Sequence, residues 1–428
     1  MTSYADIERG YLMDIIKLLL IFASIALVMK FNKPLYMSIA AGIAAAIALY
    51  GINAAEVLRL MAIGTFSKAT LYLVLAFYSI TFLQRMMEKR GHIVLAEKSL
   101  NNLFNNRRIN VMIAPFIIGL LPSAGAVLIA APIVDNSVGD YLNKEERTFA
   151  TSYYRHVSEA FLPTYSSVLL ALNLSGVDMT SFVLAMLPMV VVLFLLGYLF
   201  YIRKIPRDTG MPPSDDKMKE IKNIIVSLWA IALSITIILV FKITVHLAVI
   251  PVIVLSFLLN KFSFEEIKPM FKSAFEAKLI INTIIIMIFK EVLAFTGLIE
   301  RLPDHLSMLP VPSIVIFALV AFLGALVAGS QGSIALAIPL AYAAIPDGGV
   351  VLLVLIMSMI YISMQISPMH ICLSIITEHY GTPFIDLVKK TMPIVIAFVI
   401  ISSAYSYLLY LSHRLKRKMF RRFCQMCL

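Results

Sequence analysis

The sequence predicts an all-α polytopic membrane protein made of two inverted-topology repeats, each with about five transmembrane helices, a re-entrant hairpin and a broken helix. Three observations predict this fold class. The composition is strongly apolar, apolar runs of helix length recur along the chain, and helix-breaking residues return at a nearly constant offset in its second half.

The composition excludes an ordinary soluble protein. Hydrophobic residues make up 60% of the 428 residues, and charged residues only 14%. Soluble domains carry about 25% charged residues, so this chain cannot cover itself with a polar surface. A bilayer core needs about 20 apolar residues per helix, and helices satisfy their own backbone hydrogen bonds in lipid. The strict alternation of a β-barrel is missing, so we expect helices.

Several functional classes find no support in the motifs. The chain has neither a phosphate-binding G-x-x-x-x-G-K-[ST] loop nor an H-E-x-x-H zinc motif. A net charge of +11 fits basic cytoplasmic loops and does not indicate nucleic acid. Cys424 and Cys427 form a lone C-x-x-C, which we interpret as an incidental or lipidated tail rather than a metal or redox site. We expect no enzyme, no cofactor and no bound metal, with Na⁺ or H⁺ as a coupling ion.

The apolar runs define the expected membrane segments and their grouping. The spans are 14–31, 34–51, 69–88, 111–135, 150–175, 181–202, 223–241, 244–260, 279–298, 312–345, 350–377 and 391–411. The expected domains are a first repeat over 1–205, a cytoplasmic linker over 206–222, a second repeat over 223–412 and a basic tail over 413–428.

The repeat is read from Pro, Gly and Ser positions. The pairs Pro163/Pro368, Gly176/Gly381 and Pro188/Pro393 differ by 205, and Ser123/Ser330, Gly125/Gly332 and Pro132/Pro339 differ by 207. Order and spacing are both kept, which disfavours coincidence. Because a hairpin returns to its own side, each half crosses the membrane an odd number of times and the second half is inverted. Lys and Arg then place the N-terminus outside, although the basic tail conflicts with that orientation.

Two Ser- and Gly-rich hairpin tips, at 121–125 and 329–333, are the first candidate binding elements. Half-helix N-termini and freed amides there suit a carboxylate, whereas carbonyls and hydroxyls suit Na⁺. The alternative is close packing of helices through small residues. The candidate site residues at the tips are Ser123, Gly125, Ser330, Gln331, Gly332 and Ser333.

The two broken helices supply the other candidates. Charged residues inside a membrane usually mark a pathway or pair with each other. Arg155 and Glu159 stand four residues apart, so they either neutralise each other or handle the solute or protons, and Arg155 is also placed to snorkel. His370 either relays protons or is a structural histidine. The candidates are Glu159, Pro163, Thr164, Ser166, Ser367, Pro368 and His370 for binding, with Arg155 and His156 for coupling or gating.

The residues Gly119-Leu-Leu-Pro-Ser-Ala-Gly-Ala-Val-Leu-Ile-Ala-Ala-Pro-Ile-Val134 and Tyr154-Arg-His-Val-Ser-Glu-Ala-Phe-Leu-Pro163 resemble an uncharacterised prokaryotic membrane family, a domain of unknown function of the ion-transporter superfamily. The superfamily includes citrate, dicarboxylate, gluconate and arsenite permeases and some Na⁺/H⁺ antiporters. The resemblance implies inverted repeats whose hairpins meet at the substrate site, often in homodimers. Sodium-coupled dicarboxylate members carry Ser-Asn-Thr at both tips, whereas this chain has Pro122-Ser-Ala-Gly125 and Ser330-Gln-Gly-Ser333.

These observations lead to one expected function and several alternatives. We expect a multi-pass secondary transporter (a permease or symporter) of the plasma membrane that moves a small anion, such as an organic carboxylate, with H⁺ or Na⁺. Its expected partners are that anion and the lipid bilayer, with no nucleic acid. The runner-up is a Na⁺/H⁺ antiporter. A channel is a less favoured alternative, although re-entrant hairpins also build selectivity filters, and alternating-access kinetics would argue against it. An intramembrane hydrolase, with His370 beside Ser330 or Ser333, is less favoured because a two-fold repeat has no purpose in a single-site protease.

Overall fold

The fold is all-helical in the computed structural model, which describes residues 4–31, 33–120, 126–209, 216–298, 301 and 311–426. Over these residues the chain forms α-helices and short 3-10 turns, and one isolated bridge between Asn106 and Asp208 is its only β-type pairing. The helices up to the middle of the chain are α1 (Tyr4–Lys30), α2 (Leu35–Tyr50), α3 (Ala54–Phe66), α4 (Lys68–Lys89), α5 (His92–Phe104), α6 (Arg107–Ile118), α7 (Ala126–Val138), α8 (Lys144–His156), α9 (Ser166–Ser175) and α10 (Met179–Phe200). The later ones are α11 (Lys217–Phe241), α12 (Val245–Leu259), α13 (Phe264–Ser273), α14 (Ala277–Phe295), α16 (Ser313–Ala344), α17 (Gly349–Met364), α18 (Ile371–Tyr380) and α19 (Phe384–Met426).

The expected helices are present, and three further ones lie between the predicted spans. α3, α5 and α13 are each too short to cross a bilayer, and two of them begin at side-chain caps. Asn53 accepts a hydrogen bond from the backbone of Glu56 at the start of α3, and Ser263 and Glu266 form a capping box at α13. α11 begins at Lys217, within the stretch 206–222 that the sequence analysis expects as a linker.

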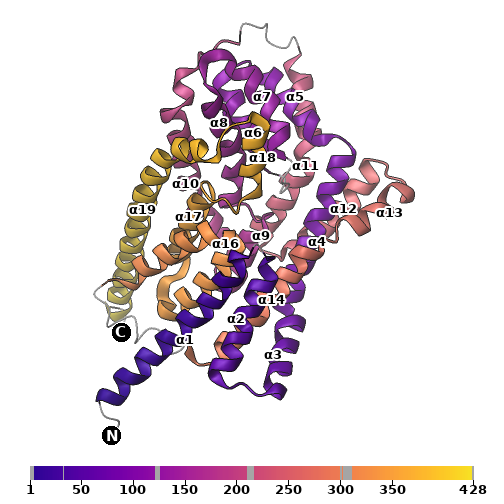
Figure 1. Cartoon of the computed structure of the whole chain (residues 1–428). Helices are drawn as coiled ribbons and strands as arrows, with labels where there is room; N and C mark the ends of the chain where they lie inside the picture. Colours follow the sequence, from indigo (N-terminus) through magenta and orange to yellow (C-terminus); the bar gives the residue numbers. More distant parts are fainter. Residues whose placement is uncertain are drawn as a thin grey trace.

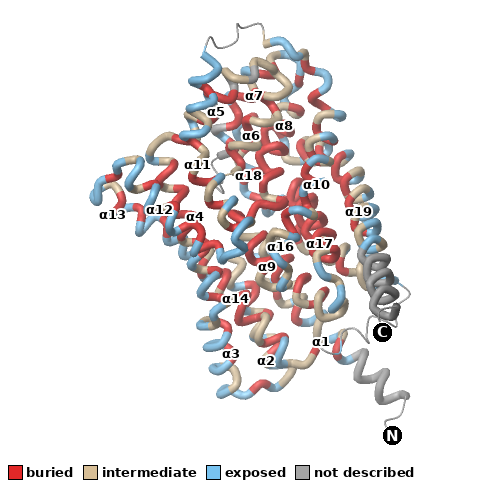
Figure 2. Tube along the Cα trace, turned by 180° about the vertical axis from the view of Figure 1, so that it is seen from behind, coloured by how far each residue is buried: buried red, intermediate tan, exposed pale blue. Residues whose placement is uncertain are grey.

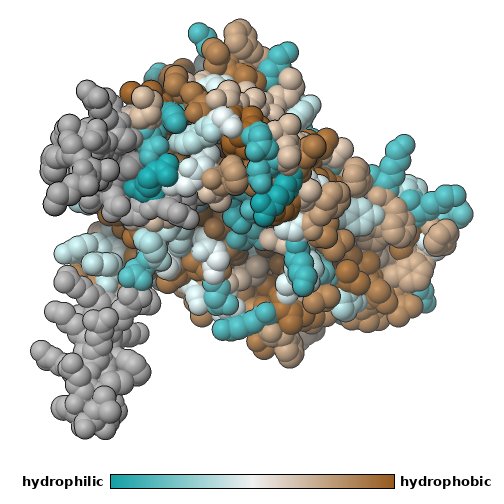
Figure 3. Space-filling view, turned by 90° about the horizontal axis from the view of Figure 1, so that it is seen from below, coloured by the Kyte–Doolittle hydropathy of each residue, from teal (hydrophilic) through white to brown (hydrophobic). Residues whose placement is uncertain are grey.

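The surface fits a lipid environment. Six helices of the described chain are long and apolar enough to cross a membrane. On α10, Leu184, Leu187, Val191 and Leu195 are each 41–61% exposed and recur every three or four residues, so they form one outward stripe. Leaving one such side chain in water instead of an apolar surrounding costs roughly 1.5–3 kcal/mol of free energy, and contact with lipid removes this cost. Exposed apolar side chains also cover much of the face seen in Figure 3.

Two helices of the interior are broken in the same way. In the first half, α8 runs into a 3-10 turn, η2 (Val157–Ala160), and helix resumes only at α9 after Pro163. In the second half, α17 ends before Ser367-Pro368 and helix resumes at α18. Both resumed helices are 10 residues long. Each stops at a left-handed glycine, Gly176 (φ 67°) and Gly381 (φ 55°), which other residues adopt only with strain.

The matching local structure keeps the offset of 205 read from the sequence, since α9 and α18 begin and end 205 residues apart. This agreement supports the repeat hypothesis for these elements. The inverted orientation, the division into domains and the side of each terminus stay predictions.

The segment 313–344 is a helical hairpin rather than one long helix. Gly329 has φ 72° and ψ 175°, which interrupts the helix. The Ser333 hydroxyl donates to the Ala321 carbonyl over 2.8 Å. In a straight helix these residues would stand about 18 Å apart, so the chain folds back at Gly329. Whether this hairpin is re-entrant in a bilayer stays a prediction.

The helices of the two halves pack along one another. Figure 1 shows α11 beside α5, α12 beside α4 and α14 beside α2 and α3. An ion pair between Arg90 and Glu266 (2.8 Å) joins the end of α4 to α13, and the Arg90 guanidinium also lies over the Phe262 ring. The buried residues of Figure 2 gather along α17, α8 and α9. The interior of the molecule is therefore built around the two broken segments.

Candidate functional site

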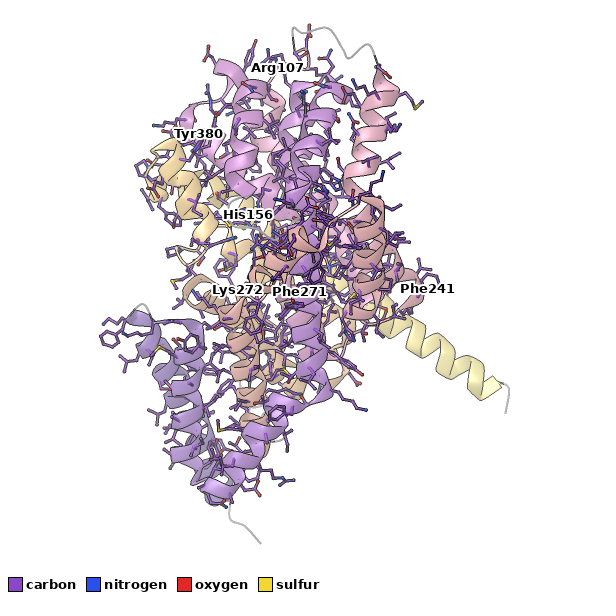
Figure 4. The ribbon with its side chains drawn as sticks, turned by 90° about the vertical axis from the view of Figure 1, so that its right-hand side faces the viewer. Arg107, His156, Phe241, Phe271, Lys272 and Tyr380 are labelled. Carbon is purple, nitrogen blue, oxygen red and sulfur yellow. The ribbon has the colours of Figure 1, made fainter. Side chains whose placement is uncertain are left out.

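The candidate site lies where the two broken segments meet in the interior. Its most polar element is α8, whose residues from Thr148 to His156 are all buried although five of them are polar or charged, namely two Thr, one Ser, one Arg and one His. Such a helix is costly in an apolar surrounding unless its polar groups are paired. Figure 4 places His156, the last residue of α8, well inside the molecule.

Arg155 and Glu159 form an ion pair in the interior. The guanidinium contacts one carboxylate oxygen, Oε1, and the arginine is only 1% exposed. The alternative that Arg155 snorkels to the membrane surface is therefore wrong, because α8 is enclosed by other helices and not by lipid. The two side chains are paired, as the neutralising interpretation expects, and a role of either in handling the solute or protons stays a prediction.

Two histidines from different halves face this carboxylate. The His156 and His370 rings are 4.5 Å apart, edge to face. The Nε2 atom of each lies 3.9 Å from a Glu159 oxygen, Oε1 for His156 and Oε2 for His370. The opposite ring nitrogens, Nδ1, face backbone carbonyls: that of Ser152 at 2.6 Å for His156 and that of Met364 at 3.2 Å for His370. Two histidines 214 positions apart along the chain thus meet around one carboxylate.

The tip of the second hairpin reaches the first half. The Gln331 side-chain amide donates to the Ser166 hydroxyl over 3.0 Å, so two predicted site residues meet at the start of α9. Gly332 is needed for close packing, because a Cβ there would lie 2.8 Å from the Ala328 Cβ. Ser330 is half-buried at the same tip.

Other predicted residues take structural positions in this arrangement. Ser333 donates to Ala321, and Ser367 donates to the Leu326 carbonyl over 2.8 Å, so both hydroxyls fasten the hairpin. Pro163 and Thr164 are buried in the first break. Pro368 is exposed, so the second break opens toward the surface on one side.

α6, the first helix of the predicted first hairpin, is hydrogen-bonded to the broken segment of the first half at Gly119, the residue that ends α6. The Ser158 hydroxyl donates to the Gly119 carbonyl over 2.6 Å, and the Tyr165 hydroxyl donates to the same oxygen. A Cβ at Gly119 would lie 2.0 Å from the Arg155 carbonyl oxygen, so only glycine allows this approach. The predicted tip residues Ser123 and Gly125 lie outside the described residues.

Two residues at the site were missed by the sequence analysis. Tyr165 binds Gly119, and Cys372 lies buried in the first turn of α18, two residues after His370. His156, His370 and Cys372 each place one ligand atom within 4.8 Å of those of the other two. The H-x-C spacing of His370 and Cys372 was visible in the sequence, but His156 joins them only through the fold.

The hydrolase alternative gains no contact from this geometry. His370 faces the Met364 carbonyl with Nδ1, and the Ser333 hydroxyl donates its hydrogen bond to the Ala321 carbonyl. Among the described residues, no hydrogen bond joins His370 to Ser330 or Ser333.

Comparisons with known proteins agree with a membrane transporter fold. A family model described as "Protein of unknown function (DUF401)" matches residues 15–411. No curated protein matches the chain. Among solved structures, the YdaH transporter of Alcanivorax borkumensis is similar, with a TM-score of 0.58 and 12% sequence identity over 84% of this chain and 90% of that one. At this identity the likeness shows the fold alone.

Proposed function

The chain belongs to the DUF401 family of proteins of unknown function, and on that premise we propose that it is a secondary active transporter for a small anion, such as an organic carboxylate, driven by H⁺ or Na⁺. One observation carries the proposal: two interrupted helices meet inside the protein at a buried guanidinium, that of Arg155. The transporter of similar fold supports the general class, because the chains align over most of their lengths. Membership in the ion-transporter superfamily and placement in the plasma membrane are parts of this proposal.

The anion is favoured because positive partial charges converge on the same place. α9 begins at Ser166 and α18 begins at Ile371, and the N-terminus of a helix attracts negative charge through its free N–H groups. Arg155 adds a full positive charge, and its planar guanidinium suits a carboxylate held by two parallel hydrogen bonds. Ser166 and the amide of Gln331 add neutral polar groups beside it.

Glu159 then acts as an internal substitute for the solute. A buried guanidinium is costly without a counter-charge, and in the absence of solute Glu159 supplies it. An entering carboxylate takes over one face of Arg155 while Glu159, 20% exposed, turns toward the histidines or solvent. Exchange of one carboxylate for another keeps the charge balanced, which makes both the empty and the loaded forms accessible, as a carrier requires.

The proposal is tested with purified protein. A thermal-shift screen against carboxylates, other small anions and monovalent cations identifies ligands, because binding to the folded state raises the apparent unfolding temperature. Labelled ligands are then followed into proteoliposomes under imposed H⁺ or Na⁺ gradients. We expect saturable anion uptake that responds to one of the two gradients. Arg155→Lys should weaken it, since a lysine cannot form the bidentate pair.

Arg59→Lys on α3 is the matched control, because Arg59 is an exposed arginine that pairs with its helix neighbour Glu56. Uptake at the wild-type rate in Arg155→Lys would remove Arg155 from the site. Exchange of Na⁺ for H⁺ without any anion uptake would instead favour the Na⁺/H⁺ antiporter.

A further inference from the structure

A cluster of electron-pair donors lies between the broken helices, and the expected coupling ions do not account for it. Its members are His156, His370, Cys372 and Glu159, contributed by α8, the turn before α18, the first turn of α18 and η2. The first three are at most 8% exposed. Among the described residues, His156 Nε2 has no hydrogen-bond partner.

The backbone decides which ring nitrogens face the cluster with a lone pair. A carbonyl oxygen can only accept, so Nδ1 of His156 must donate to Ser152 and Nδ1 of His370 must donate to Met364. In a neutral imidazole the proton on Nδ1 leaves Nε2 as an acceptor. Both Nε2 atoms point to within 3.9 Å of Glu159 oxygens, which are acceptors too. Acceptors that converge in this way repel each other unless a cation lies among them.

This arrangement is the one that metal-binding histidines show. In such histidines, the ring N–H on the side away from the metal donates a hydrogen bond to a carbonyl or carboxylate. This bond orients the ring and aims the lone pair of the other nitrogen at the metal. We propose that His156, His370 and Cys372, completed by Glu159, form a binding site for one Zn²⁺-class transition-metal ion. Two imidazoles, a thiolate and a carboxylate make a four-ligand set typical of Zn²⁺. The hard cations Mg²⁺, Ca²⁺ and Na⁺ prefer all-oxygen ligands and do not fit it.

The distances between the four ligand residues fit a tetrahedral metal site after the side chains move slightly closer together. Zn–N, Zn–O and Zn–S bonds of about 2.0–2.3 Å place tetrahedral ligand atoms about 3.3–3.6 Å apart. Here the His and Cys ligand atoms lie within 4.8 Å of one another and the carboxylate oxygens lie 3.9 Å from the two Nε2 atoms. Closing these gaps takes about 1 Å, within the reach of side-chain rotation.

The charges balance to within one unit. The thiol loses its proton to solvent on binding, so thiolate and carboxylate offset the divalent ion, and together with Arg155 the cluster then carries one net positive charge. Glu159 has two oxygens, one toward Arg155 and one toward His370, and can bridge the guanidinium and the metal. Because the ligands come from both broken segments, the bound ion fixes α8 and α18 relative to each other. The metal site shares Glu159 with the proposed anion site, but metal binding does not require that the chain transports an anion.

The test uses the full chain with Cys424→Ser and Cys427→Ser, which removes the two other thiols of the sequence as a competing ligand pair. Protein in metal-free detergent is titrated with Zn²⁺ against a chromogenic chelator, and with Co²⁺ as a spectroscopic probe. We expect one ion per chain, a tetrahedral Co²⁺ spectrum and a near-ultraviolet thiolate-to-Co²⁺ band. Millimolar Na⁺ or Mg²⁺ should not displace the metal.

Single variants assign the ligands. Cys372→Ser should remove the thiolate band. Each of the three variants Cys372→Ser, His370→Ala and Glu159→Gln should weaken Zn²⁺ binding about 10- to 100-fold or more. His379→Ala is the matched control, because His379 lies on the same α18 but is exposed. Equal affinity in Cys372→Ser and the control, an octahedral Co²⁺ spectrum, or no stoichiometric metal at all would overturn the proposal. The last result would leave a proton as the cation among the acceptors. Cys372→Ser changes a single atom, so the test does not depend on the larger substitutions folding.

Discussion

The Arg155–Glu159 pair gives the sharpest prediction about stability. Glu159→Gln leaves the guanidinium, 1% exposed, without its carboxylate. Breaking a buried ion pair by removing one partner costs about 3–5 kcal/mol. Because Glu159 is 20% exposed, we expect the lower end, about 3 kcal/mol, or roughly 100-fold in the unfolding equilibrium constant.

Removing the other partner of the pair, Arg155, should lower the free energy of unfolding by less. Arg155→Met keeps the unbranched apolar stem of the side chain and removes the guanidinium, and the remaining carboxylate can turn toward solvent, so we expect a loss of about 1–3 kcal/mol. Removing both charges together, in Arg155→Met/Glu159→Gln, should cost less than the sum of the single changes, because neither group is left unpaired. Unfolding in mixed micelles, followed by far-ultraviolet circular dichroism, measures all four proteins. Additive losses would refute the pairing. If Arg155 also binds the solute, the double variant folds and does not transport.

Three further predictions concern contacts around the site. Gly119→Ala should lower the free energy of unfolding by about 1–3 kcal/mol, since the new Cβ meets the Arg155 carbonyl oxygen at 2.0 Å; an unchanged thermal midpoint would contradict this approach. Gln331→Ala and Ser166→Ala should each raise the KM for uptake about 2- to 10-fold, the worth of one hydrogen bond, and the two effects should not add. The hydrogen bond from Arg90, together with the Ser263 backbone amide, lowers the pKa of Glu266 to about 2. The folded-state pKa is below the unfolded value of about 4.3, so this stabilisation is present above that pH and lost as the pH falls toward 2. The advantage of the wild type over Glu266→Gln in thermal unfolding should shrink over that window, and a constant difference would refute the linkage.

Local breaks were predictable from single residues. Pro163, Ser367-Pro368 and the glycines at 176 and 381 interrupt or end helices through their own backbone preferences, which need no tertiary context. The fold-back at Gly329 was predictable for the same reason. The short helices α3, α5 and α13 were missed because a search for long apolar runs passes over brief segments between spans.

The composition of the site was only half predictable. The sequence places Arg155 and Glu159 on one helical face, but burial of Arg155 depends on the helices packed around α8. The approach of His156 to His370 joins residues from two halves, and a constant offset predicts that the breaks are equivalent, not that they touch. The approach of Cys372 to His156 was not predictable for the same reason.

The central claim, an anion carrier driven by an ion gradient, is tested most directly by concentrative uptake. Proteoliposomes are loaded with buffer alone, and the internal concentration of a labelled anionic ligand is followed under an imposed H⁺ or Na⁺ gradient. The account predicts that the anion rises above its external concentration and falls back when an ionophore collapses the gradient. Uptake that stops at the external concentration would indicate a channel, and a lack of uptake for every anion that stabilises the protein would contradict the account.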